Sequence, residues 1–175
     1  MIPEYQPDPR GKSSLACIAV TLFVALGGCS TAPSVIRGPA SGDAAEVPSR
    51  ISPEQADDIT ISAVGLVGTP YRYGGNTPDS GFDCSGLIGY VYRTRAGVAP
   101  PRTVSGLQYW GQPVSRDSVR SGDLVLFAKS ATITHAGIYV GDGRFVHAPS
   151  TGGEVRLDQL NSRYWSSLRV TFRRP

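Results

Sequence analysis

The chain has 175 residues, a formal net charge of +3 and a hydrophobic content of 40%. This length is enough for one domain with a hydrophobic core of its own. The sequence contains no basic run interleaved with aromatic residues, so nucleic acid is not expected as a partner. The 21 glycines and 14 prolines are typical of a loop-rich domain with a flexible segment, and too few for a disordered chain.

The start of the chain carries the features of an export signal. Arg10 and Lys12 precede an apolar run over residues 15–26, which is too short to span a bilayer and suits the core of a signal peptide. The run ends in Leu26-Gly27-Gly28-Cys29-Ser30, which resembles the bacterial lipobox. The resemblance implies removal of residues 1–28 and acyl chains on Cys29, which would anchor the protein in a membrane. An ordinary signal peptide with an incidental cysteine is the alternative.

The segment after the lipobox separates this anchor from a folded domain. Residues 30–50 are rich in Ala, Pro, Ser and Gly without periodicity, so 29–50 is interpreted as the lipidated cysteine and a flexible tether. A coil of about 21 residues spans on the order of 25 Å. Residues 51–175 form the predicted domain. Ser30, rather than Asp, after Cys29 resembles the outer-membrane sorting pattern of Gram-negative lipoproteins, which implies a cell-envelope protein in the outer membrane, facing the periplasm.

The domain opens with a predicted helix. Ser52 is the expected N-cap, Pro53 the first helical residue and Gln55 the partner of Ser52 in a capping box. Gly68 and Pro70 end the helix. Its core-facing stripe is expected to comprise Ala56, Ile59, Ala63 and Val67.

A second helix is predicted from Cys84, after the aromatic loop Tyr71-Arg72-Tyr73-Gly74-Gly75. Leu87, Ile88 and Val91 share the face of Cys84, and the helix is expected to end near Gly97. Because Cys17 lies inside the apolar run and Cys29 at its end, Cys84 is the one thiol left in the domain. At a helix N-terminus the macrodipole favours thiolate, which predicts a nucleophile. A buried, inert cysteine is the alternative.

The pattern then turns from helix to strand. Thr103 is a candidate cap for a short helix that carries Leu107, Tyr109 and Trp110. Helices followed by strands indicate an α+β domain with an antiparallel sheet. Strands are expected over residues 124–127, 134–140, 144–148, 154–157 and 168–172.

The chain has two histidines, His135 and His147, on consecutive predicted strands. A two-residue loop at Asp142-Gly143 would put them on opposite faces of the sheet, because side chains alternate with period two. A three-residue loop from Gly141 to Gly143 makes them diagonal neighbours on one face, about 7–8 Å apart at the backbone. A catalytic role predicts the three-residue loop, and it predicts that this face packs against the N-terminus of the Cys84 helix.

In that arrangement His135 would accept the proton of Cys84 and His147 would orient His135. Backbone N–H groups at the helix start, chiefly that of Cys84, could stabilise an oxyanion, with Tyr71 as a side-chain donor. Three alternatives stay open on the residues alone: a Cys-His-His zinc site, histidines satisfied in a core, and a purely packing role for the tyrosines.

Several short motifs occur in a characteristic order. They are Tyr71–Gly75, Asp83-Cys84-Ser85-Gly86-Leu87, Pro101-Arg102-Thr103, Gly122–Phe127, His135–Gly141 and Phe145-Val146-His147-Ala148. Together they resemble the NlpC family of cell-wall cysteine peptidases, most closely its Spr-type murein endopeptidase lipoproteins, and the similarity runs from about residue 55 to 172.

The resemblance implies a reduced papain-like α+β domain with helices packed on an antiparallel sheet. It puts the nucleophile on Cys84, the base on His135 and the third polar residue on His147. Tyr71, Asp83 and Ser85 are assigned to oxyanion stabilisation or substrate positioning. The implied reaction is hydrolysis of amide bonds in peptidoglycan stem peptides or cross-links through a thioester, with no metal or organic cofactor.

Two other functions compete with this reading. A non-catalytic lipoprotein could use the same cleft to bind peptidoglycan or a partner protein. An amidase or acyltransferase on a related fold would share the site but release different products. An adaptor or a regulatory protease is left open as a further partner.

Overall fold

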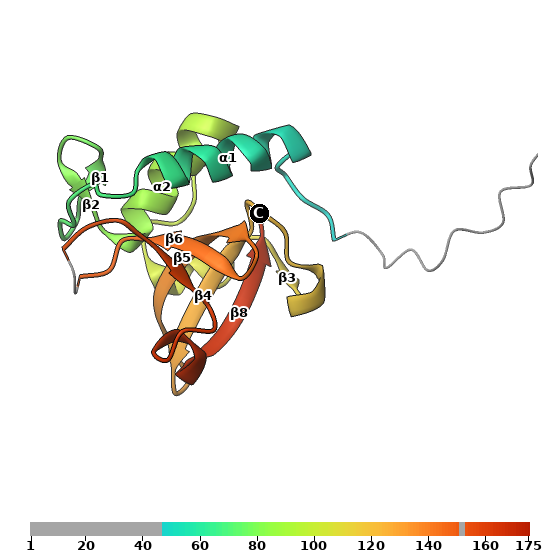
Figure 1. The fold of residues 1–175 in the computed structure, drawn as a ribbon. Coiled ribbons are helices and arrows are strands. Elements are labelled where there is room, and N and C mark those ends of the chain that lie inside the picture. Colours follow the sequence, from blue (N-terminus) through green and yellow to red (C-terminus); the bar gives the residue numbers. More distant parts are fainter. Residues whose placement is uncertain (1–46, 151–152) are drawn as a thin grey trace, which may run out of the picture. The chain divides into compact units, whose positions relative to one another are not determined.

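The computed structural model describes residues 47–150 and 153–175 (Figure 1). The predicted signal peptide, Cys29 and nearly all of the tether lie outside the described residues. Within the described part of the chain, no helix combines the length and the apolar character that crossing a membrane requires.

The first helix, α1 (Pro53–Gly65), begins as the sequence predicts. Ser52 accepts the N–H of Gln55, and the Gln55 side chain accepts the N–H of Ser52. Ile59 and Ala63 are fully buried. The prediction is wrong for Val67, which lies beyond the end of the helix and is 45% exposed.

The second helix, α2 (Cys84–Ala96), has Asp83 as its N-cap, whose carboxylate accepts the N–H of Gly86. Its buried face carries Leu87, Ile88 and Val91, as predicted. Two short strands that the sequence did not predict, β1 (Asn76–Thr77) and β2 (Gly81–Phe82), form a hairpin before it. The short helix α3 (Val104–Leu107) is capped by Thr103 and buries Leu107, but it ends before Tyr109 and Trp110.

Six strands form one antiparallel sheet in the order β3-β8-β4-β5-β6-β7. The sequence did not predict β3, and it placed the strand now seen as β7 two residues too early. The strands are β3 (Gln112–Val114), β4 (Leu124–Lys129), β5 (Thr132–Gly141), β6 (Arg144–His147), β7 (Arg156–Gln159) and β8 (Arg169–Arg174), with short 3-10 turns η1 (Arg116–Ser118) and η2 (Trp165–Ser167).

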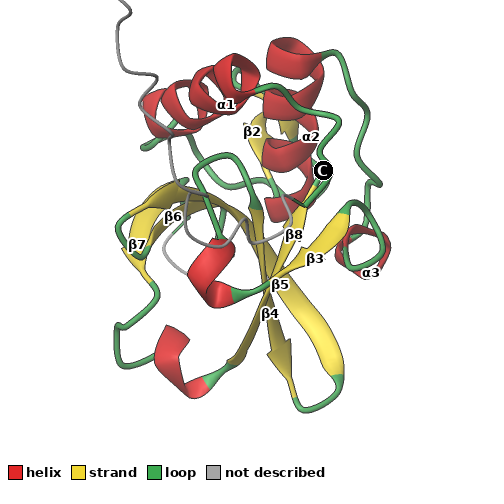
Figure 2. Cartoon of the chain, turned by 90° about the vertical axis from the view of Figure 1, so that its right-hand side faces the viewer, coloured by secondary structure: helices red, strands yellow, loops and turns green. Residues whose placement is uncertain are grey.

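The two faces of the sheet bury different cores. Helices α1 and α2 cover one face, where Ala136, Ile138 and Val146 meet their apolar side chains (Figure 1). Figure 2, turned by 90°, also shows α1 and α2 together on one side of the sheet. The other face carries a second core with Phe127, Phe145 and Trp165. The expected α+β fold with helices on an antiparallel sheet is therefore confirmed.

The β5–β6 hairpin combines the two loop geometries weighed from the sequence. Asp142 and Gly143 both have positive φ, 52° and 69°, and Gly141 pairs with Arg144, so the turn itself has two residues. The predicted three-residue loop is wrong. However, a bulge between Tyr139 and Gly141 adds one residue to β5. The bulge restores the register of the three-residue loop, with Ile138 opposite Val146, for the part of the hairpin that carries the histidines.

Candidate active site

The two histidines meet on one face of the sheet. His135 Nε2 lies 2.9 Å from His147 Nδ1, and the rings are nearly perpendicular, at 85°. His147 is fully buried. The predicted contact between the histidines is therefore confirmed, because the bulge compensates for the short turn.

A glycine makes this contact possible. A methyl group on Gly137, in the strand of His135, would lie 2.8 Å from the carbonyl oxygen of Val146 and 3.2 Å from Cβ of His147. Both are closer than normal van der Waals contacts, so any side chain at position 137 would push His147 away from His135. Position 137 therefore requires glycine for steric reasons.

The histidine pair continues to a carboxylate that the sequence did not single out. His147 Nε2 lies 3.1 Å from Asp158 Oδ2, and Trp165 Nε1 donates to the same oxygen at 2.9 Å. Asp158 pairs with Phe145 across β6 and β7, so it is a diagonal neighbour of His147. The alternation of side chains along this strand could have indicated Asp158, but the strand predicted over 154–157 ended one residue before it.

The histidines lie on the opposite face of the sheet from the one predicted to meet the Cys84 helix. His135 and His147 contact the rings of Phe127, Phe145 and Trp165, in the second core. The helices pack instead on the face of Ala136 and Ile138. The predicted packing is wrong because alternation along β5 sends residues 135 and 136 to opposite sides.

The thiol nevertheless contacts the backbone of β5, the strand that carries His135. The sulfur of Cys84 accepts the N–H of Ala136, so it lies one peptide bond from His135. The β5–β6 pairs extend only to Ile138 and Val146 at this end. Because His135 uses Nε2 toward His147, Nδ1 is the nitrogen that it can offer to the thiol.

The thiol is not activated in the way the sequence suggested. Burial raises the pKa of Cys84 above its ordinary value, and the Asp83 carboxylate raises it further. The N–H groups of Ser85, Ala136 and Cys84 itself lower the pKa, but they do not reverse this direction. The predicted preference for thiolate is therefore wrong, because burial of the sulfur and the negative charge of the Asp83 N-cap outweigh the N–H groups at the helix start.

Burial also keeps both histidines neutral. It lowers the pKa of His135 to about 3, with a further decrease from His147. It lowers the pKa of His147 to about 4, against an opposing effect of Asp158. At neutral pH the site therefore holds a neutral thiol and two neutral imidazoles.

These histidines are expected to make the folded protein less stable in mild acid. Both bind a proton at about pH 6.5 when unfolded but only near pH 3 and pH 4 when folded. Between those values the unfolded chain holds more protons, so stability falls as pH falls below 6.5. Each histidine contributes at most about 1.4 kcal/mol per pH unit.

Urea unfolding at pH values between 7 and 4 measures this slope. The pKa values of Asp83 and Asp158 lie below the ordinary 3.8, so these carboxylates lose their contribution at lower pH. A His135→Gln variant should lose about half of the slope. A slope equal to that of the native protein would contradict the expectation.

Tyr71 lies near the thiol. Burial raises the pKa of its phenol, and the charges of Cys84 and Asp83 add to the rise. Its backbone N–H donates to the carbonyl of Gly153 at 2.6 Å, which fixes the loop beside the thiol. Tyr73 in the same loop is 94% exposed. Of the two tyrosines, Tyr71 is thus the one placed near the sulfur.

Asp83 and Ser85 take part in a network that joins the aromatic loop to α2. The Asp83 carboxylate accepts from Gly86 N, Gly74 N, the Ser85 hydroxyl and the Arg102 guanidinium, at 2.7 to 3.2 Å. Arg102 also donates to the carbonyl oxygens of Gly74 and Gly75. Ser85 is 5% exposed. These contacts satisfy both side chains internally, so they fix the position of the thiol and the loop.

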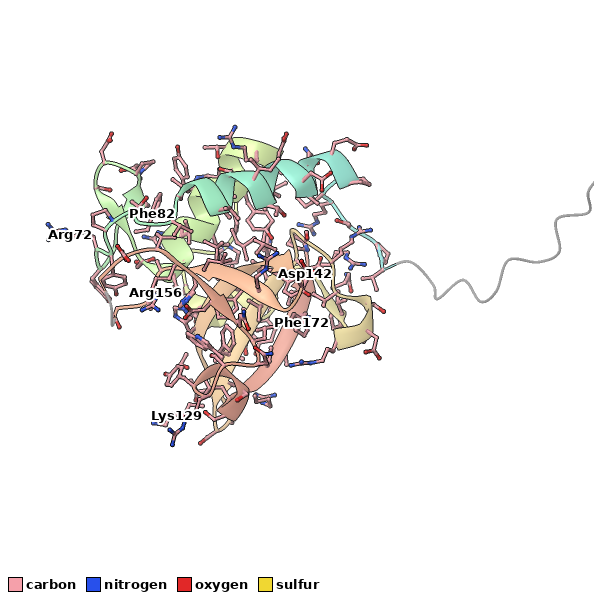
Figure 3. The ribbon with its side chains drawn as sticks, viewed as in Figure 1. Arg72, Phe82, Lys129, Asp142, Arg156 and Phe172 are labelled. Atoms are coloured by element: carbon pink, nitrogen blue, oxygen red, sulfur yellow. The ribbon has the colours of Figure 1, made fainter. Side chains whose placement is uncertain are left out.

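A pocket of about 750 Å³ opens beside the histidines. His135, Arg156 and Tyr164 contribute to its lining, together with Asp158 and Trp165. Figure 3 shows the Arg156 side chain on the same side of the view as Arg72. The pocket combines a cationic group, a carboxylate and aromatic rings with the histidine pair in its lining.

The zinc alternative is disfavoured by the way the histidines use their nitrogens. The 2.9 Å separation of His135 Nε2 and His147 Nδ1 is a hydrogen bond, with no space for an ion between the rings. No cluster of three or more His, Cys, Asp or Glu side chains within residues 47–150 and 153–175 is arranged to hold a metal.

An α+β domain with a thiol at a helix N-terminus and a histidine on the adjoining antiparallel sheet defines the class of papain-like cysteine peptidases. Within this class, the chain belongs to the NlpC/P60 family, whose sequence profile matches residues 68–174. The family resemblance inferred from the motifs is thus confirmed.

Two curated relatives come from Escherichia coli strain K12. Murein DD-endopeptidase MepH is 39% identical over 112 residues, which cover 62% of this chain and 41% of that protein. Murein DD-endopeptidase MepS/Murein LD-carboxypeptidase is 39% identical over 120 residues, which cover 69% of this chain and 58% of that protein. The chain therefore spans less than two thirds of either relative.

The solved structure of the NlpC/p60 domain of the peptidoglycan hydrolase SagA has the same fold. It is 29% identical, with a TM-score of 0.58, and the match covers 66% of this chain and 96% of that domain. The match therefore extends over nearly all of that domain.

Proposed function

We propose that this protein is a lipid-anchored cysteine endopeptidase of the bacterial cell envelope. It hydrolyses amide bonds in peptidoglycan stem peptides or cross-links. The observation that carries the proposal is the position of the Cys84 sulfur against the N–H of Ala136, the residue after His135, whose Nε2 faces His147. The names of the relatives, murein endopeptidases and a peptidoglycan hydrolase, support the substrate class.

The reaction begins with a neutral pair. As the sulfur of Cys84 attacks the amide carbonyl, its proton passes to Nδ1 of His135 and the S–C bond forms. The carbonyl oxygen becomes an oxyanion, and we assign its stabilisation to the N–H of Cys84 and the Tyr71 hydroxyl. His135 then gives the proton to the leaving amine, and the C–N bond breaks to leave a thioester.

Water completes the cycle. His135 takes a proton from the water molecule that attacks the thioester, and the C–S bond breaks as the sulfur regains the proton. The products are a carboxylic acid and an amine, and the thiol is restored. His147 stays hydrogen-bonded to His135 throughout and fixes the plane of its ring.

The anchor and the location form part of the same proposal. The lipobox-like segment ending in Cys29-Ser30 supports lipidation of Cys29 and an outer-membrane position facing the periplasm. Residues 30–50 would then let the domain reach peptidoglycan near the membrane.

The test uses the full-length protein in detergent micelles, with monomeric and cross-linked muropeptides that contain diaminopimelate. Mass spectrometry of the products should show fragments with the native protein and none with Cys84→Ala, because the variant lacks the nucleophile. The fragment masses identify the bond. If neither form cleaves but both bind muropeptides, the non-catalytic lipoprotein replaces this proposal; transfer products would indicate an acyltransferase.

A further inference from the structure

The histidine pair ends on an oxygen that is fixed from two sides. Asp158 Oδ2 accepts from Trp165 Nε1 at 2.9 Å and lies 3.1 Å from His147 Nε2. Trp165 also stacks on His135, with ring centroids 5.4 Å apart, and meets the ring of His147 edge-on at 5.0 Å. Trp165 is 6% exposed and His147 is fully buried, so both donors approach Asp158 from the interior of the protein.

The hydrogen bond from His147 to Asp158 has only one possible direction. An ionised carboxylate accepts hydrogen bonds and donates none. Burial alone would raise the pKa of Asp158, but Trp165, His147 and Arg156 together lower it. Arg156 Nη2 lies 3.6 Å from the other carboxylate oxygen, which also favours the ionised form. His147 must therefore carry its proton on Nε2.

The tautomer of His147 also determines which nitrogen of His135 carries the proton. A neutral imidazole carries one proton, so Nδ1 of His147 is an acceptor when Nε2 is protonated. The 2.9 Å contact between the rings then requires the proton on Nε2 of His135. Nδ1 of His135 is left with a lone pair, on the nitrogen that the thiol needs.

We propose that Asp158 is a positioning residue that sets the tautomers of both histidines, and that the Trp165 N–H fixes the carboxylate oxygen for this task. Asp158 touches neither the thiol nor the substrate, and it acts through His147 and His135. The kinetic consequences rest on the proposed peptidase function, but the tautomers themselves do not.

The tautomers can be read directly by long-range ¹H–¹⁵N NMR on the untagged full-length protein labelled with ¹⁵N-histidine. The chain has two histidines, so the spectrum contains two ring systems. We expect both rings to be protonated on Nε2 at pH 7. A proton on Nδ1 of either ring in the native protein would overturn the proposal.

Substitutions separate the charge of Asp158 from its geometry. Trp165 and His147 both direct an N–H at Oδ2, so an amide nitrogen cannot replace that oxygen without facing two donors. Asp158→Asn should therefore place its carbonyl there and keep both Nε2–H tautomers. In the double variant Asp158→Asn/Trp165→Phe the amide is free to turn and donate to His147, which should move the proton to Nδ1 in both rings. Unchanged tautomers in the double variant would contradict the role of Trp165.

Kinetics on muropeptides give the second readout. Asp158→Ala should lower kcat by about 10²-fold with KM changed less than about threefold, because the base is misprotonated while the substrate contacts stay. Asp158→Asn should lose no more than about tenfold. The matched control is Asp142→Asn, since Asp142 is exposed in the β5–β6 turn, well away from Arg156 (Figure 3). It should retain the native kcat.

The outcomes distinguish the two proposals. If the native protein does not cleave muropeptides but shows both Nε2–H tautomers, the peptidase function fails and the tautomer assignment stands. If Asp158→Ala keeps the native kcat and tautomers, Asp158 has no positioning role, whatever bond the enzyme cuts. If Asp158→Ala folds poorly, the test rests on Asp158→Asn and Asp158→Asn/Trp165→Phe, because asparagine preserves the volume of the side chain at position 158.

Discussion

Replacement of His135 by alanine is expected to lower kcat for muropeptide cleavage by about 10³-fold, within the range found for loss of a general acid–base group. The reason is the resting state of the site. Burial raises the pKa of Cys84 and lowers that of His135 to about 3, so no preformed thiolate can act without a base. His135 must therefore accept the proton during attack and return it to the leaving amine.

Steady-state kinetics of the native protein and of His135→Ala, with circular dichroism to verify folding, measure this effect. The pH profile adds an independent check. A protonated His135 cannot accept the thiol proton, so activity should be lost only as pH falls toward about 3, with no break near 6.5. A variant within tenfold of the native kcat, or a break near 6.5, would contradict the assigned role.

Gly86→Ala is expected to lower the free energy of unfolding by about 3 kcal/mol, at the upper end of the usual cost of overpacking, and to abolish cleavage. A methyl group at position 86 would lie 1.9 Å from the carbonyl oxygen of Gly75. That oxygen cannot yield easily, because it accepts the N–H of Asp83 and a guanidinium N–H of Arg102. The loop with Tyr71 or the start of α2 with Cys84 would have to move.

Urea unfolding and muropeptide cleavage of the same preparations test this prediction. Gly65→Ala is a matched control, because Gly65 is also in a helix but has nothing within 4 Å of the added methyl group. The control should be neutral or stabilised by up to about 1 kcal/mol and fully active. Equal stability of the two variants would show that the loop adapts to a side chain at position 86.

The sequence predicted the helices well because their ends are encoded locally. Ser52 and Gln55 cap α1, and Asp83 caps α2, through contacts within three residues along the chain. The strand positions were less accurate. The strand β3 escaped prediction because it has three residues and includes Pro113, and β7 is only four residues long. The formation of such short edge strands depends on pairing with the neighbouring strand, so the local sequence predicts them poorly.

The contact between the histidines shows the limit of local reasoning. The number of residues between the paired positions does determine whether the histidines share a face. However, the observed turn has two residues, and a bulge near Val140 supplies the third residue that the register requires. A bulge depends on how the sheet packs on both sides, and no short motif records it. The sequence thus led to the correct pair of residues through an incorrect loop.

The sequence by itself determined the chemistry that is available: one thiol in the domain, two histidines on adjacent strands and an N-cap that starts a helix at Cys84. Only the tertiary structure decided how these groups behave. Burial and the Asp83 charge oppose a resting thiolate, the histidines lie on the face away from the helices, and the thiol reaches β5 at Ala136. Asp158 and Trp165 join the site through strand register and packing. Burial, register and desolvation arise from contacts between distant parts of the chain, so local sequence patterns do not encode them.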